Sequence, residues 1–272
     1  MDFSALLPVA ALLLSAGLLG GLVAGLLGVG GGIILVPVLE ALLGTIGVPP
    51  EWRMHVAVAT SLSTIIPTSI ASSRAHHARG ATDWKLIRHW APGLLLGALA
   101  GSWLASRASG PLLSGMFGLT ALLIAIKMYL PFDHWRIRAQ VPLGLGGNLI
   151  SGFIALVSAM LGIGGGMLGV PAMTLLGEPV HRAVGTAAMF GLLIGAPATI
   201  GYLLARPGVA LPGMTVGLVS LLGFALIAPA SVLMAPLGAK LAHALSRRAL
   251  SQAFAVFLFI VAMRMFYRTF AP

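Results

Sequence analysis

Two glycine-rich stretches have residue types and a spacing that are suited to binding chemistry. Residues 28–37 read GVGGGIILVP and residues 162–171 read GIGGGMLGVP, so six of their ten positions are identical. A helix that begins at such a stretch presents up to four backbone amides without helical partners, together with the positive end of its dipole. Both features attract anions, and glycine lets a ligand touch the main chain. The stretches therefore predict an anion site built from backbone.

Hydroxyl groups of the neighbouring spans, those of Thr60, Thr186, Ser61 and Ser63, are expected to add hydrogen-bond donors to this site. The predicted substrate-binding residues are Gly28, Gly30, Gly31, Gly32, Gly162, Gly164, Gly165, Gly166, Thr60, Ser61 and Thr186. The alternative is that the glycines only allow helices to pack closely, and that Pro37 and Pro171 only kink their helices.

The sequence leaves the roles of several other polar residues open. Glu40 is the only acid inside an apolar run, so it is the candidate for a coupling role as a proton site, but it could also pair with an arginine or be solvated. His55 and His181 recur before matching segments, as pH-sensitive anion ligands or as residues at the membrane interface. Lys127 and Arg264 also recur, and they are expected to extend toward the interface.

Enzymatic chemistry has little support in the sequence. There is no cysteine and no His-Glu-x-x-His or Gly-x-Ser-x-Gly motif, and five of the six acids lie at the terminus or in loops. The pair His76 and His77 lacks a third metal ligand at a suitable spacing. We therefore predict no catalytic residues, no metal and no cofactor.

The composition predicts an integral membrane protein. Hydrophobic residues make up 58% of the chain and charged residues 8%, and the mean hydropathy is +1.03, whereas soluble domains carry about 25% charged residues. The apolar runs are continuous over helical lengths, which favours helices over an outer-membrane barrel. The net charge of +10 lies in short loops, so we interpret it as a topology signal that contacts lipid headgroups and predict no nucleic-acid partner.

Several apolar segments follow one another along the chain. The first covers residues 3–27, lacks a basic stretch before it and is expected to remain as the first span. The next, residues 33–43, would form a helix of roughly 16 Å, which is short of the ~30 Å hydrocarbon core. It is thus expected to be a half-helix, a re-entrant helix or a span completed by extended backbone. Later spans are expected at 55–72, 90–105 and 112–130.

The chain contains an internal duplication. The glycine stretches lie 134 positions apart, His55 matches His181 at an offset of 126, and Gly101 matches Gly238 at an offset of 137. We therefore predict an all-α polytopic membrane protein with two homologous halves, residues 1–133 and 134–272, of four to five transmembrane helices each.

The relative orientation of the halves depends on whether the short helix after each glycine stretch crosses the membrane. If these helices cross it, each half has five spans, and eleven Lys and Arg lie on the side of the 74–88 loop against five on the other side. If they turn back, each half has four spans and the split is ten to six. Both arrangements obey the positive-inside tendency. We favour inverted repeats, because broken helices paired about a pseudo-twofold axis meet near the midplane.

The paired Gly-x-Gly-Gly-Gly elements that end in Pro37 and Pro171, within a duplicated apolar chain, resemble the TauE/SafE family of sulfite and organosulfur anion permeases. The likeness covers residues 18–266. It implies a substrate class of small sulfur-containing or carboxylate anions and a location in the bacterial plasma or inner membrane.

The sequence as a whole predicts a secondary transporter that exports or imports small anions by alternating access between its repeats. A passive anion channel and a non-transporting membrane scaffold remain the alternatives. The expected partners are the anion and the lipid bilayer, and the small residues that pack the helices would also permit a homodimer.

Overall fold

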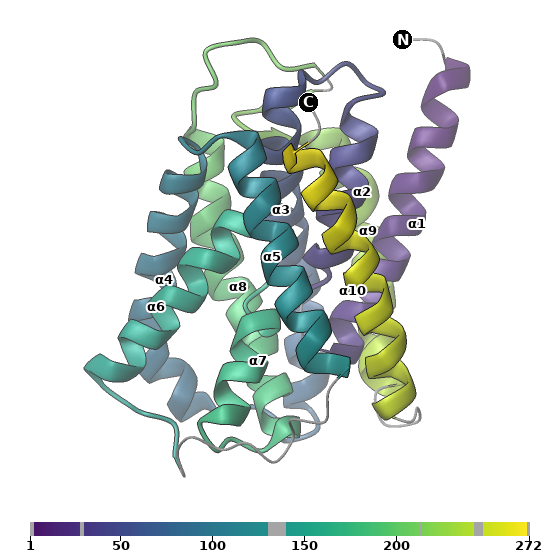
Figure 1. Cartoon of the computed structure of the whole chain (residues 1–272). Helices are drawn as coiled ribbons and strands as arrows, with labels where there is room; N and C mark the ends of the chain where they lie inside the picture. Colours follow the sequence, from purple (N-terminus) through teal and green to yellow (C-terminus); the bar gives the residue numbers. More distant parts are fainter. Residues whose placement is uncertain (1–2, 28–29, 130–139, 213, 242–246, 271–272) are drawn as a thin grey trace.

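The computed structural model describes residues 3–27, 30–129, 140–212, 214–241 and 247–270, and these residues contain ten helices. The first half contains α1 (Phe3–Leu27), α2 (Gly32–Leu43), α3 (Pro50–His77), α4 (Trp84–Ala105) and α5 (Gly110–Tyr129). The second half contains α6 (Leu145–Leu161), α7 (Gly166–Leu175), α8 (Val180–Leu204), α9 (Leu221–Leu241) and α10 (Arg247–Phe270). Strands β1 (Thr215–Val216) and β2 (Val219–Ser220) form a short antiparallel hairpin before α9. The predicted all-α fold is confirmed (Figure 1).

Helix lengths and hydropathy agree with a polytopic membrane protein. Among the described residues, α1, α3, α5, α8 and α9 contain windows long and apolar enough to cross a bilayer, with mean hydropathies from 1.3 to 2.2. Helices α2 and α7 have 12 and 10 residues, which corresponds to roughly 18 Å and 15 Å. Each glycine stretch therefore precedes a helix too short to span a bilayer, as predicted.

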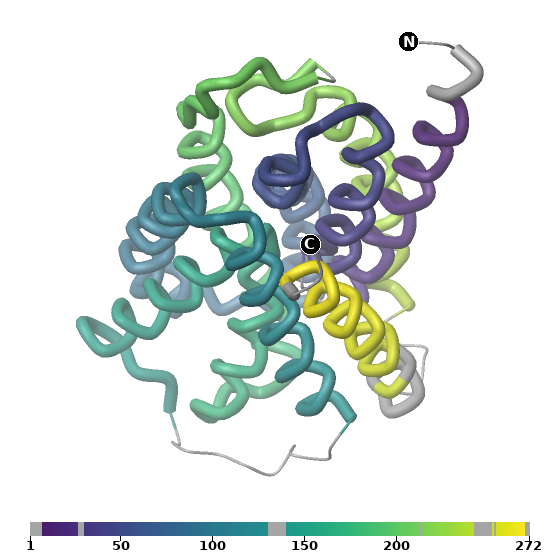
Figure 2. Tube along the Cα trace, turned by 45° about the horizontal axis from the view of Figure 1, so that its top comes forward, coloured from purple at the N-terminus to yellow at the C-terminus, as the bar shows by residue number. Residues whose placement is uncertain are grey.

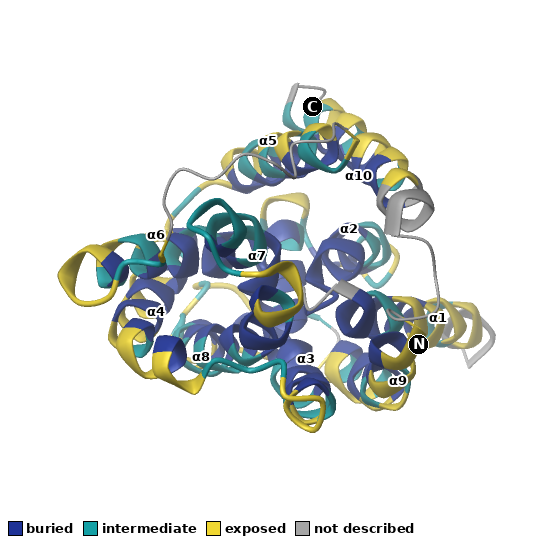
Figure 3. Cartoon of the chain, turned by 90° about the horizontal axis from the view of Figure 1, so that it is seen from below, coloured by how far each residue is buried: buried dark blue, intermediate teal, exposed yellow. Residues whose placement is uncertain are grey.

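The helices form a central group and three outer pairs. Figure 3 shows α2, α3, α7 and α8 between α4 and α6 on one side and α1 and α9 on the other, with α3 and α8 along the lower edge of the view. We call these four helices the core helices. Helices α4 and α6 pack together on one flank and α1 and α9 on another; we call these pairs the α4–α6 arm and the α1–α9 arm. The third pair is α5 with α10 (Figure 2). Each pair joins one helix from each half, so the halves are interleaved.

Glycine seams allow the two helices of each arm to approach closely. A Cβ atom on Gly97 of α4 would overlap the carbonyl of Gly152 on α6, and one on Gly21 of α1 would overlap the backbone of Ser231 on α9. The seams match at residue level, because Gly101 lies against the Leu156 carbonyl and its repeat partner Gly238 lies against the Leu22 carbonyl. Small residues at such seams are the usual way in which membrane helices associate.

Contacts between distant segments define the two ends of the bundle. At one end, which we call the Pro50 end, His55 Nε2 near the start of α3 lies 2.9 Å from the carbonyl oxygen of Ala108 in the α4–α5 turn. At the other, the Asp83 end, Asp83 before α4 contacts Arg182 near the start of α8. Helix α2 ends at the Pro50 end and α7 ends at the Asp83 end (Figure 1).

Candidate functional site

The two glycine breaks meet inside the bundle. A Cβ atom on Gly30, just before α2, would lie 3.0 Å from Gly164 Cα, just before α7. A Cβ atom on Gly32 would overlap the Gly162 carbonyl and lie 3.0 Å from Ser61 Oγ on α3. The breaks of both halves and a hydroxyl group of a core helix are therefore in direct contact.

The backbone at the first break requires glycine. Gly30 and Gly31 have φ angles of 79° and 72°, in the left-handed region that other residues rarely adopt. Gly31 is the N-cap of α2, and its carbonyl accepts hydrogen bonds from Ile34 N at 3.0 Å and Leu35 N at 3.2 Å. A side chain here would be strained by the backbone conformation and would also meet the backbone of Gly20.

The second break differs in conformation but is packed as closely. Gly162 caps the end of α6 with a φ of 70°, whereas Gly165, the N-cap of α7, is in the right-handed region. A Cβ atom on Gly165 would lie 2.6 Å from Ile194 Cδ1 and 2.7 Å from Phe190 Cβ. In this conformation the predicted glycines from Gly30 onward are buried against their neighbours. Gly28 lies outside the described residues.

Ser61 joins the predicted glycines through a hydrogen bond. Its hydroxyl group, which is fully buried, donates to the Gly162 carbonyl at 2.7 Å. This bond links α3 of the first half to the break of the second half. The structure thus brings the described glycines and Ser61 together, as the sequence predicted, while their role in binding stays a prediction.

Thr60 and Thr186 have a different placement. Thr60 Oγ1 accepts a hydrogen bond from Ser220 N at 2.9 Å, and Thr186 Oγ1 accepts one from Asp83 N at 3.0 Å. Ser220 directly precedes α9 and Asp83 directly precedes α4. The two threonines, which match in the repeat, therefore attach the start of one helix of each arm to a core helix.

Glu40 forms ion pairs with the last helix. Its carboxylate is buried, with Oε2 lying 3.3 Å from Arg264 Nη2 and Oε1 lying 3.5 Å from Arg268 Nη1. Arg264 Nη1 also donates to the Pro37 carbonyl at 3.3 Å. Of the interpretations considered for Glu40, the structure contains the arginine pairing; Arg264 contacts α2 as well as reaching the surface. A coupling role stays a prediction.

The histidines lie away from the breaks. The ring nitrogens of His55 lie 3.1 Å from the Glu51 carbonyl and 2.9 Å from the Ala108 carbonyl, at the Pro50 end. His181 is exposed near the start of α8. His77 Nδ1 accepts a hydrogen bond from Trp84 Nε1 at 3.2 Å. Across the described ranges, no three histidine, aspartate or glutamate side chains are grouped as metal ligands would be.

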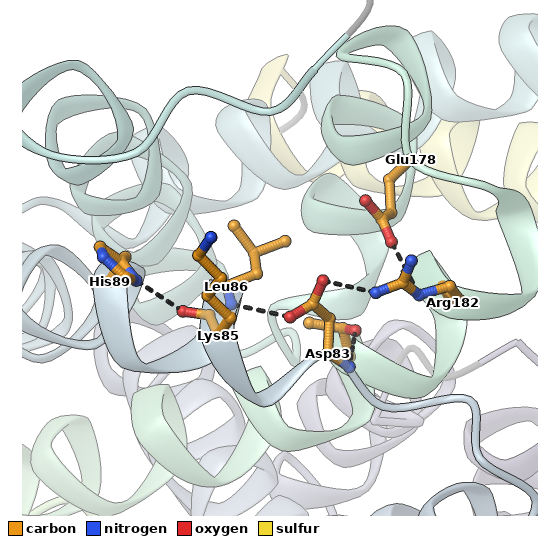
Figure 4. A network of polar contacts seen from close by, with 7 residues as sticks. Asp83, Lys85, Leu86, His89, Glu178 and Arg182 are labelled. Carbon is orange, nitrogen blue, oxygen red and sulfur yellow. Dashed lines mark hydrogen bonds and ion pairs between the residues drawn. The ribbon is translucent and has the colours of Figure 1, made fainter.

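A charged cluster at the Asp83 end was not predicted. Arg182 Nη2 lies 2.6 Å from Asp83 Oδ2, and Arg182 Nε lies 3.2 Å from Glu178 Oε1 (Figure 4). Asp83 also caps α4 by accepting from Leu86 N at 2.9 Å. Burial raises the pKa of the Glu178 carboxyl, Arg182 opposes that shift and Asp83 adds to it. Asp83 precedes α4, whereas Glu178 and Arg182 lie about a hundred positions later, before and in the first turn of α8, so no local motif marks them.

A bundle of apolar helices, in which two interrupted helices from duplicated halves meet, defines the class of multi-pass membrane transport proteins. The particular family follows from comparison with known proteins. The family model described as sulfite exporter TauE/SafE matches residues 13–265, so the chain belongs to this family.

Relatives from distant organisms have names of the same kind. The chain is 32% identical to a "Probable membrane transporter protein" of Haemophilus influenzae over 262 residues, which cover 94% of this chain and 98% of the relative. It is 30% identical over 212 residues to a protein of the same description from Methanocaldococcus jannaschii, which covers 75% of each chain. No solved structure matches the chain.

Proposed function

We propose that this membrane transporter carries small anions, with sulfite, sulfonates and related organosulfur or organic anions as its substrates. The observation that supports the proposal is the meeting of two broken helices from different halves, with Gly30 against Gly164 and Gly32 against Gly162. The helix N-termini at these breaks offer main-chain amides to a negative charge. The description of the family as sulfite exporters supports the substrate class.

The two halves act as inverted repeats in this proposal. Repeat-related α2 and α7 end at opposite ends of the bundle, and α3 and α8 begin at opposite ends. A pseudo-twofold axis in the membrane plane relates such elements, and it gives alternating access a symmetric design. With the basic 74–88 loop in the cytoplasm, the Asp83 end faces inward.

Substrate binding requires the two breaks to separate. In the described conformation Gly30, Gly32 and Ser61 contact the opposite break directly. An anion that enters would replace these contacts with hydrogen bonds from the amides of α2 and α7 and from Ser61. In a bacterial inner membrane, the inside-negative potential then favours export by about 2.3 kcal/mol per charge per 100 mV.

Counterflow in proteoliposomes tests the function. Purified protein reconstituted into vesicles loaded with sulfite is expected to take up external labelled sulfite with saturable kinetics, and sulfonates are expected to compete. Conductance that does not saturate would indicate a passive channel instead. Absence of any anion flux, with correctly inserted protein, would indicate a scaffold.

A pair of serine variants tests the site. Ser61→Ala removes the hydrogen bond to the Gly162 carbonyl, and an unsatisfied buried carbonyl costs about 1–3 kcal/mol. Ser63→Ala is the control, because Ser63 Oγ donates to the Thr60 carbonyl within its own helix. We expect counterflow by Ser61→Ala to fall about ten-fold and that by Ser63→Ala to stay near wild type. Equal activities of both variants would remove Ser61 from the site.

A further inference from the structure

A polar cleft opens at the Asp83 end between the α4–α6 arm and the core helices. Its volume is about 290 Å³, and its walls come from the start of α4, the segment before α6 and the loop between α7 and α8. The lining residues that carry charge are Asp83, Lys85, Glu178 and Arg182. Figure 4 shows Arg182 between Asp83 and Glu178.

The repeat places a second cleft at the Pro50 end, between the α1–α9 arm and α2. Residues that line the first cleft have matching residues in the second: Asp83 corresponds to Ser220 and Lys85 to Leu222 at an offset of 137, and Leu143 corresponds to Val9 at an offset of 134. The second cleft has a volume of only about 10 Å³ and a largely apolar lining. The two clefts are therefore equivalent in position, and one is open while the other is closed.

The two arms share one hydrogen bond to the core but differ in their ion pairs. Both arms are held at the core by a backbone amide that donates to a threonine hydroxyl, Asp83 to Thr186 and Ser220 to Thr60. At the Asp83 end, charged residues add a bridge between the α4–α6 arm and the core. The positions that correspond to Asp83, Glu178 and Arg182 are Ser220, Gly44 and Val56, which cannot form one.

We infer that the cleft at the Asp83 end is the access route for the anion, and that Arg182, which bridges Asp83 and Glu178, fixes the position of the α4–α6 arm against the core. The inference rests on the proposed transport function and adds the residues that control access from one side. Arg182 and Glu178 belong to a core helix and its preceding loop, whereas Asp83 caps α4 in the arm. Movement of the arm away from α8 must therefore separate Arg182 from Asp83.

Distances between spin labels test the inference without the need for substrate. The chain contains no cysteine, so cysteines at Leu145 on α6 and Val180 on α8, both exposed, can be labelled uniquely. Arg182→Gln and Asp83→Asn remove the charge pair, and the asparagine keeps a carbonyl oxygen that can cap α4. We expect both variants to increase the population at longer Leu145–Val180 distances about two- to five-fold, because the loss of an exposed ion pair shifts a conformational equilibrium by about this factor.

Two controls separate arm movement from general loosening. Lys85→Gln alters the same cleft without removing the bridge and is expected to leave the distances unchanged. A second label pair, at Leu7 on α1 and Thr45 after α2, reports on the Pro50 end and is also expected to stay unchanged. An unaltered Leu145–Val180 distribution in Arg182→Gln, or equal broadening at both ends, would overturn the inference.

The same samples distinguish failure of the inference from failure of the proposed function. Sulfite counterflow by the unlabelled protein together with unaltered distances in Arg182→Gln would retain the transport function and reject the role of Arg182. Shifted distances in a protein that transports no anion would reject the transport function and, with it, the assignment of the cleft as an anion route.

Discussion

At the scale of single residues, the charge of Glu40 inside the apolar part of the bundle is held in ion pairs. Glu40 is buried on α2, and each of its carboxylate oxygens lies near one guanidinium group of α10. Both arginine side chains are 40% exposed, so solvent weakens these pairs. A carboxylate held in this way stabilises the position of α2 against α10.

Glu40→Gln separates the structural role from the coupling role. Because the substitution leaves Arg264 and Arg268 without their acid, we expect it to lower the free energy of unfolding by about 1 kcal/mol, measured by thermal unfolding in detergent. The response of transport to a proton gradient is expected to be the same as in wild type. Glu51→Gln is the matched control, because Glu51 is exposed at the same end. A proton dependence lost only in Glu40→Gln would instead assign the coupling role to Glu40.

The sequence could predict residues whose function depends on the main chain, but not contacts between distant side chains. The repeated glycines mark the breaks because positive φ angles and close approach exclude other residues, as at Gly31. The contacts of Thr60 and Thr186 with the arms were not predictable, since their donors lie 160 and 103 positions away. The arginine partner of Glu40 was considered, but nothing in the sequence identified which arginine it was.

At the scale of elements, close packing along glycine seams makes each arm a unit. The seam of the α4–α6 arm brings Gly93, Gly97 and Gly101 against the backbone of α6, and the seam of the α1–α9 arm uses Gly17, Gly21 and Gly25 in the same spacing. Helix lengths follow from uninterrupted apolar runs, so the sequence could predict the helices. It could not predict that each arm pairs helices from different halves, because hydropathy does not specify a partner.

Substitution of a seam glycine should separate the arm helices. Gly97→Val would force side-chain atoms into the Gly152 backbone, and overpacking of this kind costs typically 1–3 kcal/mol. We expect a lower melting temperature and less monodisperse protein by size-exclusion chromatography. Gly146→Val on α6 is the control, since no atom lies within 4 Å of a Cβ atom there. Equal stability of both variants would show that the seam tolerates side chains and does not hold the arm together.

At the scale of the whole molecule, the distribution of charge and the direction of the helices determine orientation in the membrane. The predicted loop 74–88 is shorter in the structure, because α3 extends to His77 and α4 begins at Trp84. Its remaining segment, residues 78–83, lies at the Asp83 end, whereas the corresponding segment between α8 and α9 lies at the Pro50 end with the start of α9. Inverted repeats place these two segments on opposite sides of the membrane, whereas parallel repeats would place them on the same side. Their accessibility therefore discriminates between the two arrangements.

Single cysteines at Ala78 and Val209 test this arrangement, because both positions are exposed and the chain has no cysteine of its own. We expect a membrane-impermeant maleimide to label Val209→Cys in intact spheroplasts and to label Ala78→Cys only after the membrane is permeabilised, since the side with more Lys and Arg faces the cytoplasm. Thr45→Cys, at the Pro50 end, should behave like Val209→Cys. Labelling of Ala78→Cys and Val209→Cys from the same side would contradict inverted repeats, and with them the symmetric relation between the two clefts on which alternating access through this bundle depends.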